Sequence, residues 1–186
     1  LSIRRQRQMC IRDRRQAEAL KHYEKALELK PDYYEAWWGK GVVLAAMGQH
    51  EEALRAFDKA LELKPDSFEA WNNKGLVLDE MGRQDEALEA YKRAGELEPD
   101  SVDAGINKAV ALGHLGRHQE ALEAIEKAIE LQPDCADAWL NKGAALAQLR
   151  SYERAVQAYA KAIELSPFDA RAWFGSAGTF CLIGDK

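Results

Sequence analysis

Two histidines give this sequence its best spacing for metal chemistry. His114 and His118 are four residues apart, and on one helix this spacing would place both imidazoles on the same face. Gly116 lies between them, and glycine favours a turn with positive φ. We therefore expect the two rings to lie on different faces and to be solvated. The sequence predicts no metal site and no cofactor.

Candidate nucleophiles and acid–base pairs are equally sparse. Cys10, Cys135 and Cys181 are far apart, form no Cys-x-x-Cys motif and have no histidine at a useful spacing. No phosphate-binding, dinucleotide-binding, zinc-protease or serine-hydrolase motif occurs. Acidic residues are abundant, but they recur along the chain instead of converging on one place. The sequence therefore predicts that the chain is not an enzyme and has no catalytic residue.

A strict repeat organises the chain. All five prolines are 34 residues apart, at Pro31, Pro65, Pro99, Pro133 and Pro167. Six residues after the proline stands a tryptophan in four of the five repeats, at Trp37, Trp71, Trp139 and Trp173. Gly105 takes this place in the remaining repeat. A fixed period of this length indicates stacked supersecondary units.

Each unit is predicted to be a pair of helices. In the first full repeat they span about residues 34–47 and about residues 50–63, and Gly48 supplies the turn between them. Gly82, Gly116 and Gly184 recur at this turn, and Arg150 replaces the glycine once, at a cost of about 1 kcal/mol. An acidic residue precedes each first helix and is its expected N-cap: Asp32, Asp66, Asp100 and Asp134.

Small and large residues also recur at fixed places, which predicts close packing of antiparallel helices. The residue four after the tryptophan position is small: Gly41, Gly75, Ala109 and Gly143. In the second helices an alanine is followed by a large residue four positions on: Phe57, Tyr91, Ile125 and Tyr159. With the proline and the period, this pattern resembles the tetratricopeptide repeat over residues 17–184. The resemblance implies an all-α, right-handed solenoid of stacked antiparallel helix pairs.

The repeat boundaries divide the chain into a basic leader, two partial repeats and four full ones. The predicted segments are the leader 1–15, a second helix 16–33, repeats 34–67, 68–101, 102–135 and 136–169, and a first helix 170–186. Residues 6–14 resemble translated sequencing-adapter sequence, so we expect the leader to be non-native or disordered. The alternative is a genuine basic arm for an acidic partner. Gly95, Gly105 and Ala109 depart from the pattern in adjacent repeats, so we expect their junction to be the weakest.

The resemblance implies that the first helices line a concave groove for an extended peptide or a partner helix. Two residues after the tryptophan position stand Asn73, Asn107 and Asn141. Amides both donate and accept hydrogen bonds, so three in register can hold a peptide main chain. The alternative is that they only bond to the neighbouring repeat. Trp38 and Phe174, one residue after a tryptophan, are the expected apolar contacts, and at Trp38 the packing position is already filled by Trp37.

The charge distribution bears on the class of partner. The chain has 26 basic and 31 acidic residues. Residues 1–15 contain six arginines and one aspartate, so the rest of the chain has a net charge of −10. An anionic body disfavours nucleic acid and anionic membranes as partners. Unpaired cysteines and the lack of a signal peptide predict a cytoplasmic location.

The predicted function is a protein–protein interaction scaffold or adaptor that binds an extended, apolar and partly basic segment. One alternative is the substrate-recognition arm of a larger enzyme, for example a glycosyltransferase. Another is self-association through the ends of the array, where Trp173, Phe174, Phe180 and Leu182 form an apolar last helix.

Overall fold

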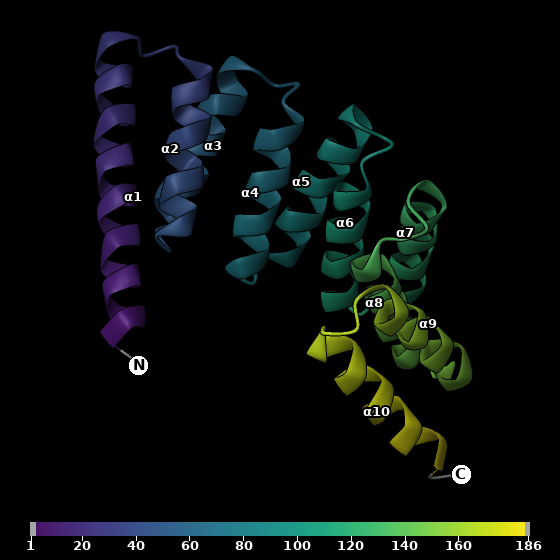
Figure 1. Cartoon of the computed structure of the whole chain (residues 1–186). Coiled ribbons are helices and arrows are strands. Elements are labelled where there is room, and N and C mark those ends of the chain that lie inside the picture. The colour runs from purple at the N-terminus through teal and green to yellow at the C-terminus, as the bar shows by residue number, and fades with distance from the viewer. Residues whose placement is uncertain (1–2, 185–186) are drawn as a thin grey trace. The chain divides into compact units, whose positions relative to one another are not determined.

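The computed structural model describes residues 3–184, and it describes side chains for residues 14–183. The described residues form ten α-helices and no strand (Figure 1). Their bounds are α1 Ile3–Leu29, α2 Tyr34–Ala46, α3 His50–Leu63, α4 Phe68–Glu80, α5 Gln84–Leu97, α6 Val102–His114, α7 His118–Leu131, α8 Ala136–Gln148, α9 Tyr152–Leu165 and α10 Ala170–Gly184. No helix in this part of the chain is long and apolar enough to cross a bilayer.

The helices group into two compact units, one ending at Arg83 and the other beginning at Gln84. The division falls inside the predicted repeat 68–101, between its two helices, and not at the junction that follows it. In the first unit α1 packs on α2, α2 on α3 and α3 on α4. In the second unit each helix from α5 to α10 packs on the next in the same way. The predicted all-α fold of stacked helix pairs is confirmed.

The turns inside the repeats have one geometry. Gly48, Gly82 and Gly116 have φ values of 75°, 74° and 72°. Arg150 has a φ of 58°, so the arginine adopts the left-handed conformation that glycine adopts elsewhere. In all four turns the next residue's amide donates to a carbonyl five residues before it, as in Ser151 N to Leu146 O at 2.9 Å. The turn at Arg150 therefore has the same geometry as the turns that contain glycine.

The predicted aspartate N-caps are wrong by one residue. The N-cap of α4 is Ser67 and that of α6 is Ser101, and each serine hydroxyl accepts a hydrogen bond from the amide three residues on. At α2 and α8 the N-caps are Tyr33 and Cys135, without a side-chain hydrogen bond. α2 begins at Tyr34, where the sequence pattern placed it, so the N-cap is Tyr33 and Asp32 lies one residue before it.

Small residues and aromatic rings meet as predicted. A Cβ atom on Gly41 would lie 2.6 Å from Cε1 of Phe57, and a Cβ atom on Gly143 would lie 2.7 Å from Cδ1 of Tyr159. Phe57 and Tyr159 are both buried. Glycine at these places lets the two helices of a repeat approach until the ring fills the space.

The first helix is longer than the sequence pattern implies. α1 runs from Ile3, so residues 3–15 of the basic leader continue the helix that was expected to begin near residue 16. That the leader is non-native or disordered stays a prediction, and residues 1 and 2 lie outside the described part.

Candidate functional site

The position two residues after the tryptophan faces the second helix of the preceding repeat. At Gly39 a Cβ atom would lie 2.5 Å from the Tyr23 ring of α1, and at Gly175 it would lie 2.6 Å from the Tyr159 ring of α9. Asn73, Asn107 and Asn141 hold the same register position, and all three are half-buried. The asparagines therefore lie where consecutive repeats pack, and part of each side chain remains accessible.

The structure places only two of the three asparagines in one unit. Asn73 lies on α4 in the first unit, whereas Asn107 on α6 and Asn141 on α8 belong to the second. The Nδ2 atom of Asn141 donates to the Asp137 carbonyl at 2.9 Å, one turn back on its own helix. No hydrogen bond to the Oδ1 atom of Asn141 is found among the described residues.

A cavity of about 210 Å³ brings Asn141 together with apolar side chains. Its walls come from α6, α7 and α8, and they include Val110, Ala144 and Gln148 beside Asn141. In the first unit, Val42 and Leu76 hold the same repeat position as Val110 and are exposed. A polar amide next to accessible apolar atoms is the combination that a peptide groove needs.

His114 and His118 line this same cavity from two different helices, so they do not share a helix face, as expected. His114 ends α6 and His118 begins α7, and the turn at Gly116 reverses the chain so that both residues reach one space. Sequence reasoning did not foresee that the two residues line one cavity. No group of three or more metal-ligating side chains exists among the described residues.

Trp38 and Phe174 differ in their surroundings. Trp38 is half-buried, and its Nε1 atom is buried without a hydrogen-bond partner among the residues that the structure describes. That Trp38 contacts a partner stays a prediction. Phe174 on α10 is 83% exposed, as expected, and so is available to a partner.

The tryptophans themselves are structural. The indole Nε1 atoms of Trp37, Trp71, Trp139 and Trp173 donate to the carbonyl of the proline six residues before, at 2.8, 2.9, 2.8 and 2.9 Å. Three of these rings lie under a lysine, with Lys40, Lys74 and Lys142 at 5.7, 5.3 and 5.4 Å from the ring centroids. Each of these bonds links a proline turn to the first helix that follows it.

One acid in the first turn of a first helix, Asp137, is paired with a residue of the following repeat. The Nη2 atom of Arg171 lies 2.7 Å from Oδ1 of Asp137 and 2.7 Å from Oδ2 of Asp169. These hydrogen bonds raise the pKa of the Arg171 guanidinium, and the hydrogen bonds from Arg171 lower the pKa of Asp169. The acids at the matching repeat position, Glu35, Glu69 and Asp103, are exposed.

Models of the tetratricopeptide-repeat family match most of the chain. Two models described as tetratricopeptide repeat match residues 32–97 and 106–178, and one described as TPR repeat matches residues 15–48. No curated protein matches.

Several solved structures are similar. The crystal structure of YrrB, described as a TPR protein with an unusual peptide-binding site, is 29% identical, with a TM-score of 0.77 over 88% of this chain and 84% of that one. A crystal structure of MamA is 26% identical, with a TM-score of 0.75 over 82% of this chain and 89% of that one. MamA from Desulfovibrio magneticus RS-1, at 24% identity and a TM-score of 0.79 over 90% and 94% of the two chains, shares the fold.

Proposed function

Because the chain belongs to the tetratricopeptide-repeat family, we propose that it is a protein-interaction scaffold that holds an extended peptide or a partner helix along its first helices. The observation that carries this proposal is the cavity of about 210 Å³ in which Asn141 lies beside Val110 and Ala144. The peptide-binding site in the description of YrrB supports it, since that protein shares the fold at 29% identity.

The chemistry of the cavity defines the ligand. The amides of Asn141 and Gln148 can hydrogen-bond to a peptide main chain irrespective of its side chains. The apolar atoms of Val110 and Ala144 can accept a small or aliphatic side chain. Exposed acids along the first helices favour a segment with basic residues, so the proposed ligand is extended, apolar and partly basic.

The test is a peptide array probed with the full chain and with a variant in which Asn73, Asn107 and Asn141 are all alanine. We expect the triple variant to bind every peptide that the parent chain binds about tenfold more weakly, because hydrogen bonds to a peptide main chain do not depend on the peptide's side chains. The control is Gln119→Ala, which removes an exposed amide from the second helix α7 and should leave all spots unchanged. Undiminished binding by the triple variant would mean that the asparagines serve only the packing of the repeats.

A further inference from the structure

One junction in the second unit departs from the repeat at three positions, each of which holds a large apolar or an acidic residue in most of the other repeats. Gly105 stands where the first helix of the other repeats has its tryptophan. The aliphatic residue ten positions before it, which is Leu27, Leu61, Ile129 or Ile163 in the other repeats, is Gly95. The acid that faces the lysine of the next helix, which is Glu24, Asp58 or Glu126, is Lys92.

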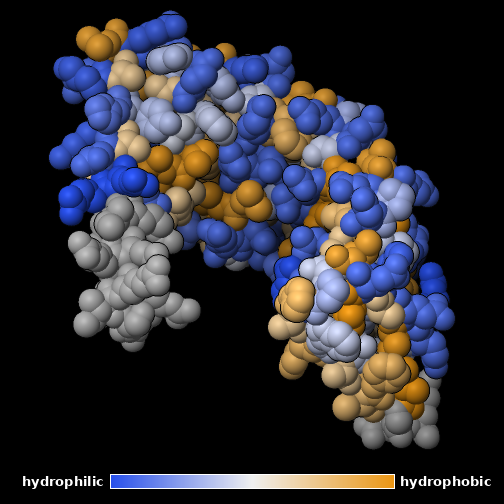
Figure 2. Space-filling view, viewed as in Figure 1, coloured by the Kyte–Doolittle hydropathy of each residue, from blue (hydrophilic) through white to orange (hydrophobic). Residues whose placement is uncertain are grey.

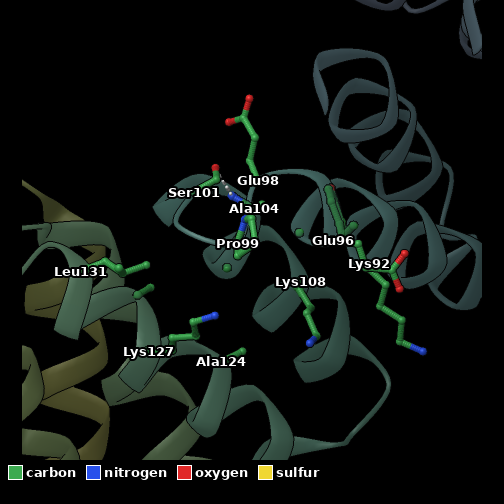
Figure 3. A pocket seen from close by; sticks show the side chains of 14 residues that line it. Lys92, Glu96, Glu98, Pro99, Ser101, Ala104, Lys108, Ala124, Lys127 and Leu131 are labelled. Carbon is green, nitrogen blue, oxygen red and sulfur yellow. Dashed lines mark hydrogen bonds between the residues drawn. The ribbon is translucent and has the colours of Figure 1, made fainter. Parts of the chain in front are cut away.

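Together the two glycines leave a cavity of about 260 Å³ between α5, α6 and α7 (Figure 3). A Cβ atom on Gly95 would meet no atom within 4 Å. On Gly105 it would meet the Ala128 Cβ at 3.5 Å and the Ala124 carbonyl oxygen at 3.8 Å, which are ordinary contacts. The cavity therefore has an apolar floor and no strain, and it lies just below the size of pockets that hold drug-sized molecules, which suits a single side chain.

The other repeats show which side chain fits such a place. In them an indole fills the space after the proline and donates its N–H to the proline carbonyl. Pro99 lines the cavity at the matching position, and Gly105 has no side chain to make this hydrogen bond. The cavity therefore combines the space of an indole with the acceptor that an indole N–H uses in this fold.

The charges around the cavity differ from those at the complete junctions. Lys40, Lys74 and Lys142 pair with the facing acid, at 3.3, 2.6 and 2.9 Å. Lys108 is their counterpart, but Lys92 stands at the position of the facing acid and Gly105 at that of the tryptophan. Within the described part of the chain neither Lys108 nor Lys127 has an ion pair, although Lys25, Lys59 and Lys161, the counterparts of Lys127, each pair with the glutamate three residues on.

The acids that line the cavity do not cancel this charge. Glu96 is paired with Arg93 at 3.1 Å, and Lys92 is 3.9 Å from Glu89. The Glu98 carboxylate extends away from the other labelled side chains in Figure 3. Lys108 and Lys127 therefore lie at the edge of the cavity with no carboxylate of the described residues within ion-pair distance, although the charges of Lys92 and Lys108 contribute to the lowered pKa of Glu120.

We propose that this cavity docks a tryptophan side chain from an acidic segment of a partner protein. The indole lies against Gly95 and Gly105 and donates its N–H to the Pro99 carbonyl. Lys108 stacks over the ring and, with Lys127, pairs with carboxylates that flank the tryptophan. No lining residue is shared with the groove cavity around Asn141, so this surface and its partner are independent of the proposed peptide groove.

The test uses isothermal titration of the full chain with the capped peptide Glu-Asp-Trp-Asp-Glu and with a matched peptide that has alanine for tryptophan. We expect the tryptophan peptide to bind at least tenfold more tightly. Lys108→Gln and Lys127→Gln should each weaken it several-fold, whereas Lys142→Gln, the matched lysine of a complete junction, should have no effect. Equal binding of the two peptides would overturn the proposal.

Two variants fill the cavity from within the chain. Gly105→Trp restores the repeat's own indole, and Gly95→Leu restores its aliphatic residue, so each should abolish binding while circular dichroism shows an intact helical fold. If either folded variant binds the tryptophan peptide unchanged, the cavity is not the docking site. If free indole-3-acetate binds as tightly as the peptide, the occupant is a small molecule and the partner is wrongly assigned. The Asn141→Ala variant should bind the peptide normally, which separates this test from that of the groove.

Discussion

At the scale of single residues, Arg150 shows that the turn geometry is set by its hydrogen bonds and not by glycine alone. Its φ of 58° lies close to the values of Gly48, Gly82 and Gly116. The Cβ atom in this conformation crowds the following carbonyl, which costs roughly 1–2 kcal/mol in an L-residue. The strain is offset by the packing of α8 on α9, which would be lost if the turn opened.

We therefore expect Arg150→Gly to stabilise the protein by about 1 kcal/mol, because glycine adopts this backbone conformation without strain. The gain should appear as a higher midpoint in urea denaturation with an unchanged slope. The reverse change at the matched turn, Gly116→Arg, should destabilise by a similar amount. A loss of stability in Arg150→Gly would mean that the arginine side chain makes a compensating interaction.

At the scale of the helices, the first turns depend on residues that follow the predicted caps. Ser67 is fully buried, and its hydroxyl accepts from the Ala70 amide at 3.1 Å and donates to Glu69 Oε2 at 3.0 Å. The Tyr34 hydroxyl forms a further hydrogen bond with the same oxygen. This serine thus joins the start of α4 to the first turn of α2.

We expect Ser67→Ala to destabilise the chain by about 1–2 kcal/mol, since it removes an N-cap and leaves the Tyr34 hydroxyl without this partner. The matched change at the acid that the sequence pattern favoured, Asp66→Ala, should cost less than about 0.5 kcal/mol because Asp66 is exposed. Thermal unfolding followed by circular dichroism measures both. A larger effect at Asp66 would restore the sequence-based assignment of the cap.

The start of α10 should respond to acid. Asp169 accepts from the Arg171 amide at 2.9 Å and from its guanidinium, and these hydrogen bonds lower the pKa of the carboxyl group in the folded protein. A lowered pKa stabilises the fold above the unfolded value of about 4, and the contribution is lost as the pH falls through the folded pKa. Asp169→Asn should therefore lose less stability than the parent chain between about pH 5 and pH 2. Parallel pH profiles of the two proteins would exclude this contribution.

At the scale of the whole molecule, apolar side chains are exposed together on α10. Phe180 is 58% and Leu182 is 47% exposed, and apolar side chains gather over this helix in Figure 2. A contiguous apolar face of this kind favours association.

We expect the average mass in sedimentation equilibrium to rise with concentration, and Phe180→Asp to abolish the rise. Phe168→Asp is the matched control, because Phe168 is fully exposed in the turn before the helix. It should leave the association unchanged. A monomer at all concentrations would contradict the prediction.

The sequence predicted the helix pairs, the turns and the contacts between small and aromatic residues, because each follows from a local pattern repeated at a fixed interval. It placed the caps one residue early although it gave the start of α2 correctly, because it took the acid after the proline as the cap. It assigned His114 and His118 to different helix faces, but it did not show that the turn brings both residues to one cavity. It noticed Gly95 and Gly105 as departures, but only the packing of α5, α6 and α7 shows that both open one cavity.

The missing indole at Gly105 also has a consequence for local opening of the chain. At the other junctions a hydrogen bond from the indole N–H to the proline carbonyl links the turn to the next helix. The turn at Pro99 lacks this hydrogen bond because Gly105 has no side chain. Amides protected only by local structure exchange with solvent through local unfolding. The amide of Ala104 should therefore exchange its hydrogen for deuterium faster than that of Ala70, its counterpart in a repeat that has the indole hydrogen bond. A tryptophan bound in the cavity would slow this exchange, so the exchange rate of the Ala104 amide would indicate whether the cavity is occupied.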